Sequence, residues 1–173
     1  METAEEKRLS LTEFALPAYE EIPDVGLFLE QVVRYTAKYT DTAALAPLTG
    51  SMVSNYVKKK IIRNPVKKMY SRDQIAYLLF IAVAKNVIPI EDMQFLFEQQ
   101  QKHCAIGEAY EFFRVRLQES LRQVFGLTES TQALSSNGMD WQSILDKICV
   151  PAAHEICLDR CITQLKAAEA AKQ

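Results

Sequence analysis

Apolar residues recur every three or four positions along most of this chain, a spacing that is typical of amphipathic helices. Residues that cap helices stand before several of these segments: Asp24, Thr49 or Ser51, Ser71 and Asp140. The pattern predicts helices from Val25 to about Tyr39, Gly50 to about Lys60, Arg72 to about Asn86, Ile90 to about Gln101, Gly107 to Phe125, and from Asp140 onward. We therefore expect an all-α, mostly helical protein.

The segment that begins at Arg72 is apolar on most sides, which predicts the central helix of the core. Ser71 followed three residues later by Gln74 is a capping-box signal for its first turn. Pro151 is expected to kink or divide the last predicted helix. The core candidates of that last helix are Ile144, Ile148, Ile156 and Ile162. Residues Gly126 to Gly138 are rich in Ser, Thr and Gly and are expected to form a loop.

The predicted helix from Gly50 to Lys60 has two different sides. Its apolar side is formed by Met52, Val53, Tyr56 and Val57. A polar, partly cationic stripe at spacing i, i+3, i+4 and i+7 is formed by Ser51, Ser54, Asn55 and Lys58. After this helix, Pro65 excludes a helix through the segment from Arg63 to Tyr70. A two-stranded wing or a basic loop both fit that segment.

Positive charge is concentrated in the same part of the chain. The protein has 20 Lys and Arg against 22 Asp and Glu, a net charge of −2. Seven of the 20 cations lie between Thr49 and Arg72 with no acidic residue among them, which leaves 13 basic residues against 22 acidic ones elsewhere. A charge run is usually a solvated surface, but such a concentration also attracts polyanions, most commonly nucleic acid.

The segment Val53–Ile62, VSNYVKKKII, is similar to the helix pattern L-R-Y-Y-E-K-x-G-L-I of MerR-type regulators. Tyr56 falls on the second tyrosine, whereas Ser54 replaces the usual arginine and Lys60 the usual glycine. The positions of the family's wing motif R-x-Y-S are occupied by Lys68, Tyr70 and Ser71. Further on, the residues Ile90-Glu91-Asp92-Met93 resemble the L-E-E-I that opens the family's next helix.

More closely, the run from LPAYEEIPD through SNYVKKKIIRNPVKK to YSRDQIAYLLFI resembles an uncharacterised bacterial family, a domain of unknown function that is often assigned to the MerR-like group. The resemblance implies a MerR-like winged helix-turn-helix with a small wing at residues 14–101. Residues 1–13 are expected to be a flexible N-terminus. Residues 102–173 are expected to be a helical extension for dimerisation or effector binding.

The resemblance and the charge together predict a transcriptional regulator that binds double-stranded DNA as a homodimer. The bases are expected to be contacted by Ser51, Ser54 and Asn55, and Tyr56 is counted with this site. The residues expected to neutralise phosphates are Lys58, Lys59, Arg63, Lys67, Lys68 and Arg72. The alternative is a protein-interaction adaptor that uses the same basic face.

A thiol or metal sensor is a third hypothesis, because His154, Cys157 and Cys161 share one helical face at spacing i, i+3 and i+7, with Cys149 upstream. Buried cysteines are the commoner interpretation. An enzyme is not expected, since the chain has only two histidines and lacks a Gly-rich phosphate loop and a nucleophile elbow. We therefore expect no catalytic residue, no metal and no cofactor.

Most aromatic residues at helical spacing are expected in the core: Tyr77, Phe80, Phe95, Phe97, Phe112 and Phe113. A cavity among them that receives an apolar effector is the alternative. The longest apolar run, Ile75 to Ala84, has ten residues and is too short to cross a membrane. The N-terminus has no signal-peptide pattern, and the four cysteines form no CxxC pair, so a cytoplasmic protein is expected.

Overall fold

The computed structural model describes residues 14–43, 45–128, 138 and 140–172. Its elements are the 3-10 helix η1 (Tyr19–Glu21), strand β1 (Leu27–Phe28), helices α2 (Leu29–Thr42) and α3 (Gly50–Lys58), strand β2 (Met69–Tyr70), and helices α4 (Arg72–Ala84), α5 (Ile90–Gln101), α6 (Ile106–Val124) and α7 (Trp141–Ala170). The expectation of a mostly helical protein is confirmed. The predicted flexible N-terminus, 1–13, and most of the predicted loop from Gly126 to Gly138 lie outside the described residues.

Helix α4 is the centre of the fold, as its apolar sequence predicts. Ten of its 13 residues are buried. Its capping box is formed as expected: the Ser71 hydroxyl accepts a hydrogen bond from the Gln74 backbone N–H at 3.4 Å, and the Gln74 side chain accepts one from the Ser71 N–H at 2.8 Å. The helix ends at Ala84, two residues before the predicted end.

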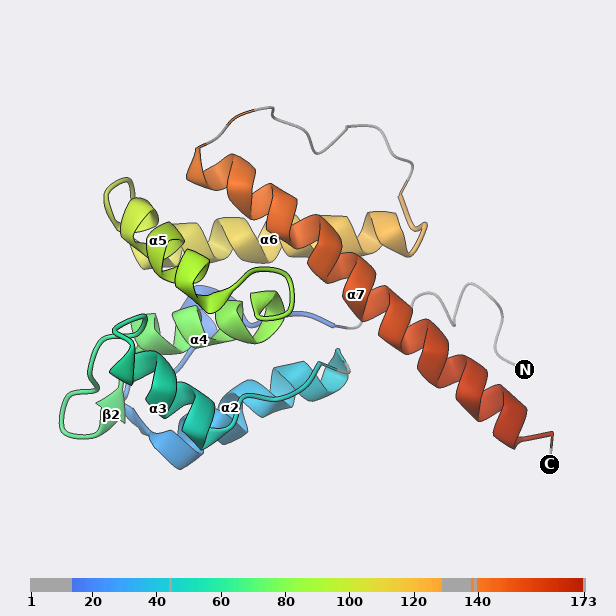
Figure 1. Cartoon of the computed structure of the whole chain (residues 1–173), viewed down its shortest axis with the longest axis horizontal. Coiled ribbons are helices and arrows are strands. Elements are labelled where there is room, and N and C mark those ends of the chain that lie inside the picture. The colour runs from blue at the N-terminus through green and yellow to red at the C-terminus, as the bar shows by residue number, and fades with distance from the viewer. Residues whose placement is uncertain (1–13, 44, 129–137, 139, 173) are drawn as a thin grey trace.

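Two layers of helices cover α4 (Figure 1). Helices α2 and α3 lie on one side of it, and α6 and α7 cross each other on the other side. The buried side chains form one continuous cluster from Phe14 to Ile156, which includes residues on both sides of the expected boundary at Gln101. Packing therefore connects the segment that carries the basic residues to the C-terminal helices.

An N-terminal strap, residues 14–22, ties these layers together. Phe14 and Ile22 are fully buried in the common core. The Tyr110 hydroxyl of α6 donates a hydrogen bond to the Pro17 carbonyl at 2.9 Å, and the Tyr19 N–H donates one to the Glu111 carboxylate at 2.6 Å. The strap thereby holds α6 at a fixed place beside α4.

The predicted start of the first long helix is wrong. Helix α2 begins at Leu29, not Val25, because Leu27 and Phe28 form a strand that pairs antiparallel with β2, with Leu27 opposite Tyr70. Strand pairing uses the backbone groups that a helix would need. Asp24 consequently caps no helix in the structure.

Of the two expected effects of Pro151, a kink or a division, the division does not occur, because α7 runs as one helix through 30 residues. Pro151 is exposed, so the backbone carbonyl that loses its partner lies on the solvent side of the helix. The second half of α7 extends beyond the rest of the molecule (Figure 1). Ile162, a predicted core residue, is therefore 42% exposed, and Phe95 of α5, also placed in the core, is 58% exposed.

Within the described ranges, no helix combines the length and the apolar character needed to cross a membrane.

Replacement of Gly26 by alanine is expected to destabilise the fold, because a Cβ atom there would lie 2.7 Å from the Cβ of Met69 on the paired strand. Neither atom is at the flexible end of a side chain, so the strand pair must shift. The free energy of unfolding, measured by urea denaturation, is expected to fall by about 1–3 kcal/mol.

The matched control is Gly50→Ala in the first turn of α3, where the nearest side-chain atom would be Leu29 Cδ2 at an ordinary 3.6 Å. This change is expected to leave stability unaltered or to raise it by up to about 1 kcal/mol. An equal loss in both variants would contradict the strand-pair explanation.

Candidate nucleic-acid interface

The polar stripe of α3 faces solvent, as its spacing predicts. The Thr49 hydroxyl caps the helix by accepting a hydrogen bond from the Met52 N–H at 3.2 Å. The stripe residues Ser51, Ser54, Asn55 and Lys58 are all exposed. The opposite side is held in the core by Val53. A rigid helix therefore presents short polar side chains at its start and a lysine at its end.

A backbone reversal at Lys60 ends this helix. Lys60 has a φ of 61°, in the left-handed region that favours glycine. Its N–H donates to the Val57 carbonyl at 3.0 Å, and the Ile61 N–H donates to the Tyr56 carbonyl at 3.0 Å, which is the Schellman pattern of hydrogen bonds. Ile61 and Ile62 then enter the core, as expected. The Lys60 side chain is left exposed beside Lys58 and Lys59.

The segment after the helix turns back on itself and closes with an isolated β-bridge between Val66 and Met69; this turn is called the wing below. Val66 and Met69 exchange two backbone hydrogen bonds, of 3.1 Å and 2.9 Å. Between them, Lys67 and Lys68 have φ values of 50° and 64°, the positive values of a type I′ turn. Strand β1 pairs with the outer side of β2 and supports the hairpin. Both lysines therefore stand at the tip of a short wing.

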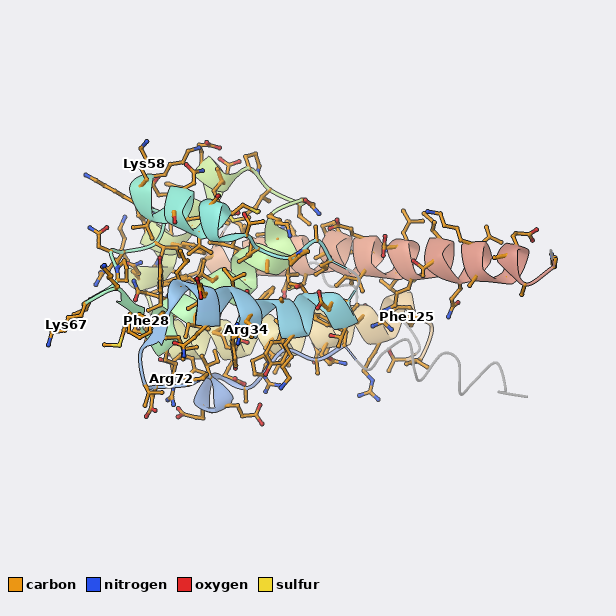
Figure 2. The ribbon with its side chains drawn as sticks, turned by 90° about the horizontal axis from the view of Figure 1, so that it is seen from below. Phe28, Arg34, Lys58, Lys67, Arg72 and Phe125 are labelled. Carbon is orange, nitrogen blue, oxygen red and sulfur yellow. The ribbon has the colours of Figure 1, made fainter. Side chains whose placement is uncertain are left out.

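The cations of α3 and of the wing gather at one end of the molecule. Figure 2 shows Lys58 and Lys67 projecting outward at that end, away from the far end of α7. Five exposed cations make no ion pair within the described residues: Lys58, Lys60, Arg63, Lys67 and Lys68. Lys59 lies 3.3 Å from Glu91, but both side chains are exposed and solvent weakens the pair. Backbone hydrogen bonding at the start of α5, and then Lys59, lower the pKa of Glu91. The positive charge at this end is therefore largely uncompensated.

Tyr56, although expected at the DNA-binding site, lies on the side of α3 that its spacing predicts to be apolar. Its side chain is only 6% exposed and lies on the inner side of α3, and burial raises the pKa of its hydroxyl. The second tyrosine of the MerR-type pattern is a core residue in this fold.

Arg72, expected at phosphates, is held by contacts within the protein. Its Nε donates to the Ile22 carbonyl at 2.8 Å, and its Nη1 lies 2.9 Å from the Glu20 carboxylate. Asp24 is 3.8 Å from Nη2, and the Tyr19 ring lies under the guanidinium at 5.4 Å. These contacts fasten the N-terminal strap to the start of α4.

Three surface residues near the site were missed or left out by sequence reasoning. Lys60 is one of the clustered cations but not one of the expected phosphate contacts, although it directly follows Lys58 and Lys59 in the sequence. Phe28 and Val66 are apolar yet 52% and 74% exposed. Nothing in the local pattern marks these two, because their exposure depends on how β1 and the wing pair.

The cysteines form no metal site in the part of the chain that the structure describes: no group of three His, Cys, Asp or Glu could hold an ion there. Cys149 is fully buried near the Phe113 carbonyl, and burial raises its pKa to about 12. Burial and then the neighbouring Cys161 raise the pKa of Cys157. Cys161 itself is exposed and not a core residue.

Replacement of Arg72 by alanine is expected to lower the free energy of unfolding by about 1–3 kcal/mol, because the Ile22 carbonyl and the strap lose a charge-assisted donor. Urea denaturation measures the effect. Lys67→Ala is the matched control: it removes an exposed cation with no ion pair among the described residues, and is expected to change stability by less than about 0.5 kcal/mol. Equal effects of the two substitutions would show that Arg72 does not hold the strap.

Comparison with protein-family models matches residues 17–113 to a family described as "Domain of unknown function (DUF1836)". The matched range is more than half of the 173 residues and contains α3, the wing and α4. Searches of the curated proteins and of the solved structures found no match.

Proposed function

This chain belongs to the DUF1836 family, and from that starting point we propose that it is a DNA-binding transcriptional regulator of the MerR-like winged helix-turn-helix type. Helix α3 enters the major groove of double-stranded DNA, and the wing follows the adjacent backbone. The observation that supports this most strongly is the group of five exposed cations that flank the polar stripe of α3 and make no ion pair with any other described residue.

Two structural details favour the MerR-like type. Lys60 occupies the glycine position of the MerR-type helix pattern and has the positive φ for which a glycine is suited. Lys68, Tyr70 and Ser71, at the positions of the R-x-Y-S motif, fall in the turn and the second strand of a hairpin and at the cap of α4. The departure at Lys60 is therefore compatible with a backbone turn at the glycine position of the pattern.

The exposed residues divide into two roles. Ser51, Ser54 and Asn55 are short enough to let the helix approach base edges, and an asparagine amide pairs with adenine through two hydrogen bonds. The lysines and Arg63 neutralise phosphates, which orients the protein on the duplex without specifying sequence. Lys59 joins them once DNA competes with Glu91 for its ammonium group.

Selection from a random double-stranded pool is expected to enrich one motif. Titration of that motif at several salt concentrations should give a slope of log affinity against log salt of about −4 to −5 per protomer, because about five phosphates are neutralised. In the variant Lys67→Asn/Lys68→Gly, the slope should become shallower by about 2. The pair Asn-Gly is favoured in a type I′ turn, so the wing itself should be kept.

Lys147→Asn serves as the control, since it removes a cation of α7, which lies outside the proposed surface. Its slope should equal that of the unsubstituted protein. A slope that does not change in the wing variant would place DNA elsewhere, and no binding at low salt would reject the proposal.

A two-fold symmetric dimer is part of the same proposal, because palindromic sites are bound by symmetric proteins. The protruding half of α7 carries Leu158, Ile162 and Leu165, which are 61%, 42% and 63% exposed. Their spacing of four and three residues is that of an apolar coiled-coil seam. In an antiparallel pairing that sets Ile162 against Leu165 of a second copy, Asp159 faces the second copy's Lys166.

Charge reversal tests this pairing. Asp159→Lys is expected to weaken the dimer at least tenfold, because the new lysine of each copy then faces Lys166 of the other copy across the seam. The double variant Asp159→Lys/Lys166→Asp should restore it. Analytical ultracentrifugation measures the dimer constant. Failure of the double variant to restore association, or a monomeric unsubstituted protein, would contradict this interface.

The alternative of a protein-interaction adaptor has one specific observation in its favour: Phe28 and Val66 place exposed apolar side chains beside the wing lysines. Apolar anchors within a charged rim are typical of protein interfaces. An adaptor predicts that Phe28→Ser abolishes binding of a protein partner, whereas DNA selection at low salt returns no motif.

A further inference from the structure

An open groove lies between the strap, the wing and the turn that joins α5 to α6. Its volume is about 810 Å³, and its lining includes Tyr19 of the strap, Met69 of the wing and Ile106 at the start of α6. Small-molecule sites in proteins commonly have volumes of roughly 300–1,000 Å³. The groove is therefore large enough for a small metabolite.

Side chains of both charges line this groove: Asp24, Arg63 and Asp73. Asp24 lies 3.8 Å from the Arg72 guanidinium. Arg63 and Asp73 form no ion pair with each other or with any other residue in the part of the chain that the structure describes. The carboxylates of the lining outnumber its guanidinium, so an anion alone is not favoured, whereas a cation alone would leave Arg63 unpaired. A zwitterion, which carries one charge of each sign, matches this lining.

The first turn of α4 places both of these unpaired charges. The Tyr19 hydroxyl donates a hydrogen bond to Oδ1 of Asp73, and Oδ2 accepts none from the described residues. Gln74, the next residue of α4, donates a hydrogen bond from its side-chain amide to the Arg63 carbonyl at 2.8 Å. This bond fixes the backbone of Arg63 beside Asp73, while the Arg63 side chain stays exposed.

Tyr77, which also lines the groove, shows that the two charges lie near one point. Burial has the largest effect on the pKa of its hydroxyl and raises it. The negative charge of Asp73 raises this pKa further, and the positive charge of Arg63 lowers it by a smaller amount. Charges more than about 10 Å apart are largely screened in salt solution, so both groups lie close to the Tyr77 hydroxyl. The groove therefore holds two opposite charges near one another that make no direct contact.

We propose that the groove binds a free α-amino acid with an apolar side chain. The carboxylate of the ligand accepts two hydrogen bonds from the Arg63 guanidinium, a geometry to which arginine is suited. Its ammonium group donates a hydrogen bond to Oδ2 of Asp73. Its side chain lies against the apolar part of the lining, which is formed by Val66, Met69 and Ile106. One small molecule then completes both charge pairs.

Titration with L-leucine, followed by two-dimensional NMR of the isotope-labelled protein, tests this site. The resonances of groove residues, such as the side-chain amide of Gln101, are expected to shift to saturation. Two control compounds each lack one charge of the ligand: 4-methylpentanoate has no ammonium group, and 3-methylbutylamine has no carboxylate. Each should bind at least tenfold more weakly than L-leucine, because one charged group of the groove stays unpaired. No saturable shift, or equal binding of either control compound, would overturn the proposal.

Two variants assign each charge of the ligand to its partner. Arg63→Gln should weaken L-leucine at least tenfold but should not weaken 3-methylbutylamine, which has no carboxylate. Asp73→Asn should weaken L-leucine to a similar extent but should not weaken 4-methylpentanoate, and its amide oxygen can still accept the bond from Tyr19. Lys67→Gln, outside the groove lining, should bind L-leucine as the unsubstituted protein does. Unchanged binding of L-leucine in either groove variant, or an equal loss in Lys67→Gln, would overturn the proposal.

The amino-acid site shares Arg63 with the proposed DNA surface, yet the two proposals fail separately. L-leucine is titrated without DNA, so saturable binding together with no selected DNA motif rejects only the proposed function. A selected motif with no response to L-leucine rejects only the amino-acid site.

Discussion

The burial of α4 on almost every side is the constraint on which the rest of the structure depends. A helix that is apolar all round must be covered on all faces, so the other helices form layers around it. Its N-terminus also positions the candidate site. The Gln74 side chain, whose oxygen accepts the capping-box bond, also donates a hydrogen bond from its amide nitrogen to the Arg63 carbonyl at 2.8 Å. This bond ties the segment before the wing to the central helix.

The basic residues serve two purposes that the sequence does not separate. Arg72 points inward and holds the strap through Ile22 and Glu20, whereas Lys58, Lys67 and Lys68 point into solvent. The interior contacts fix the backbone from which the exposed cations project. Like charges that project from one end of the molecule repel one another, which costs some stability.

Local sequence pattern predicted the helices, the capping box of Ser71 and Gln74 and the exposed stripe from Ser51 to Lys58, because the direction of a helical side chain follows from its spacing alone. Long-range contacts were out of its reach. The pairing of Phe28 with Met69 shortened the first helix, and the bond between Arg72 and Glu20, 52 residues apart, makes Arg72 an anchor for the strap. Spacing reveals which side chains share a face; whether that face meets protein or solvent depends on segments that come together only when the chain folds.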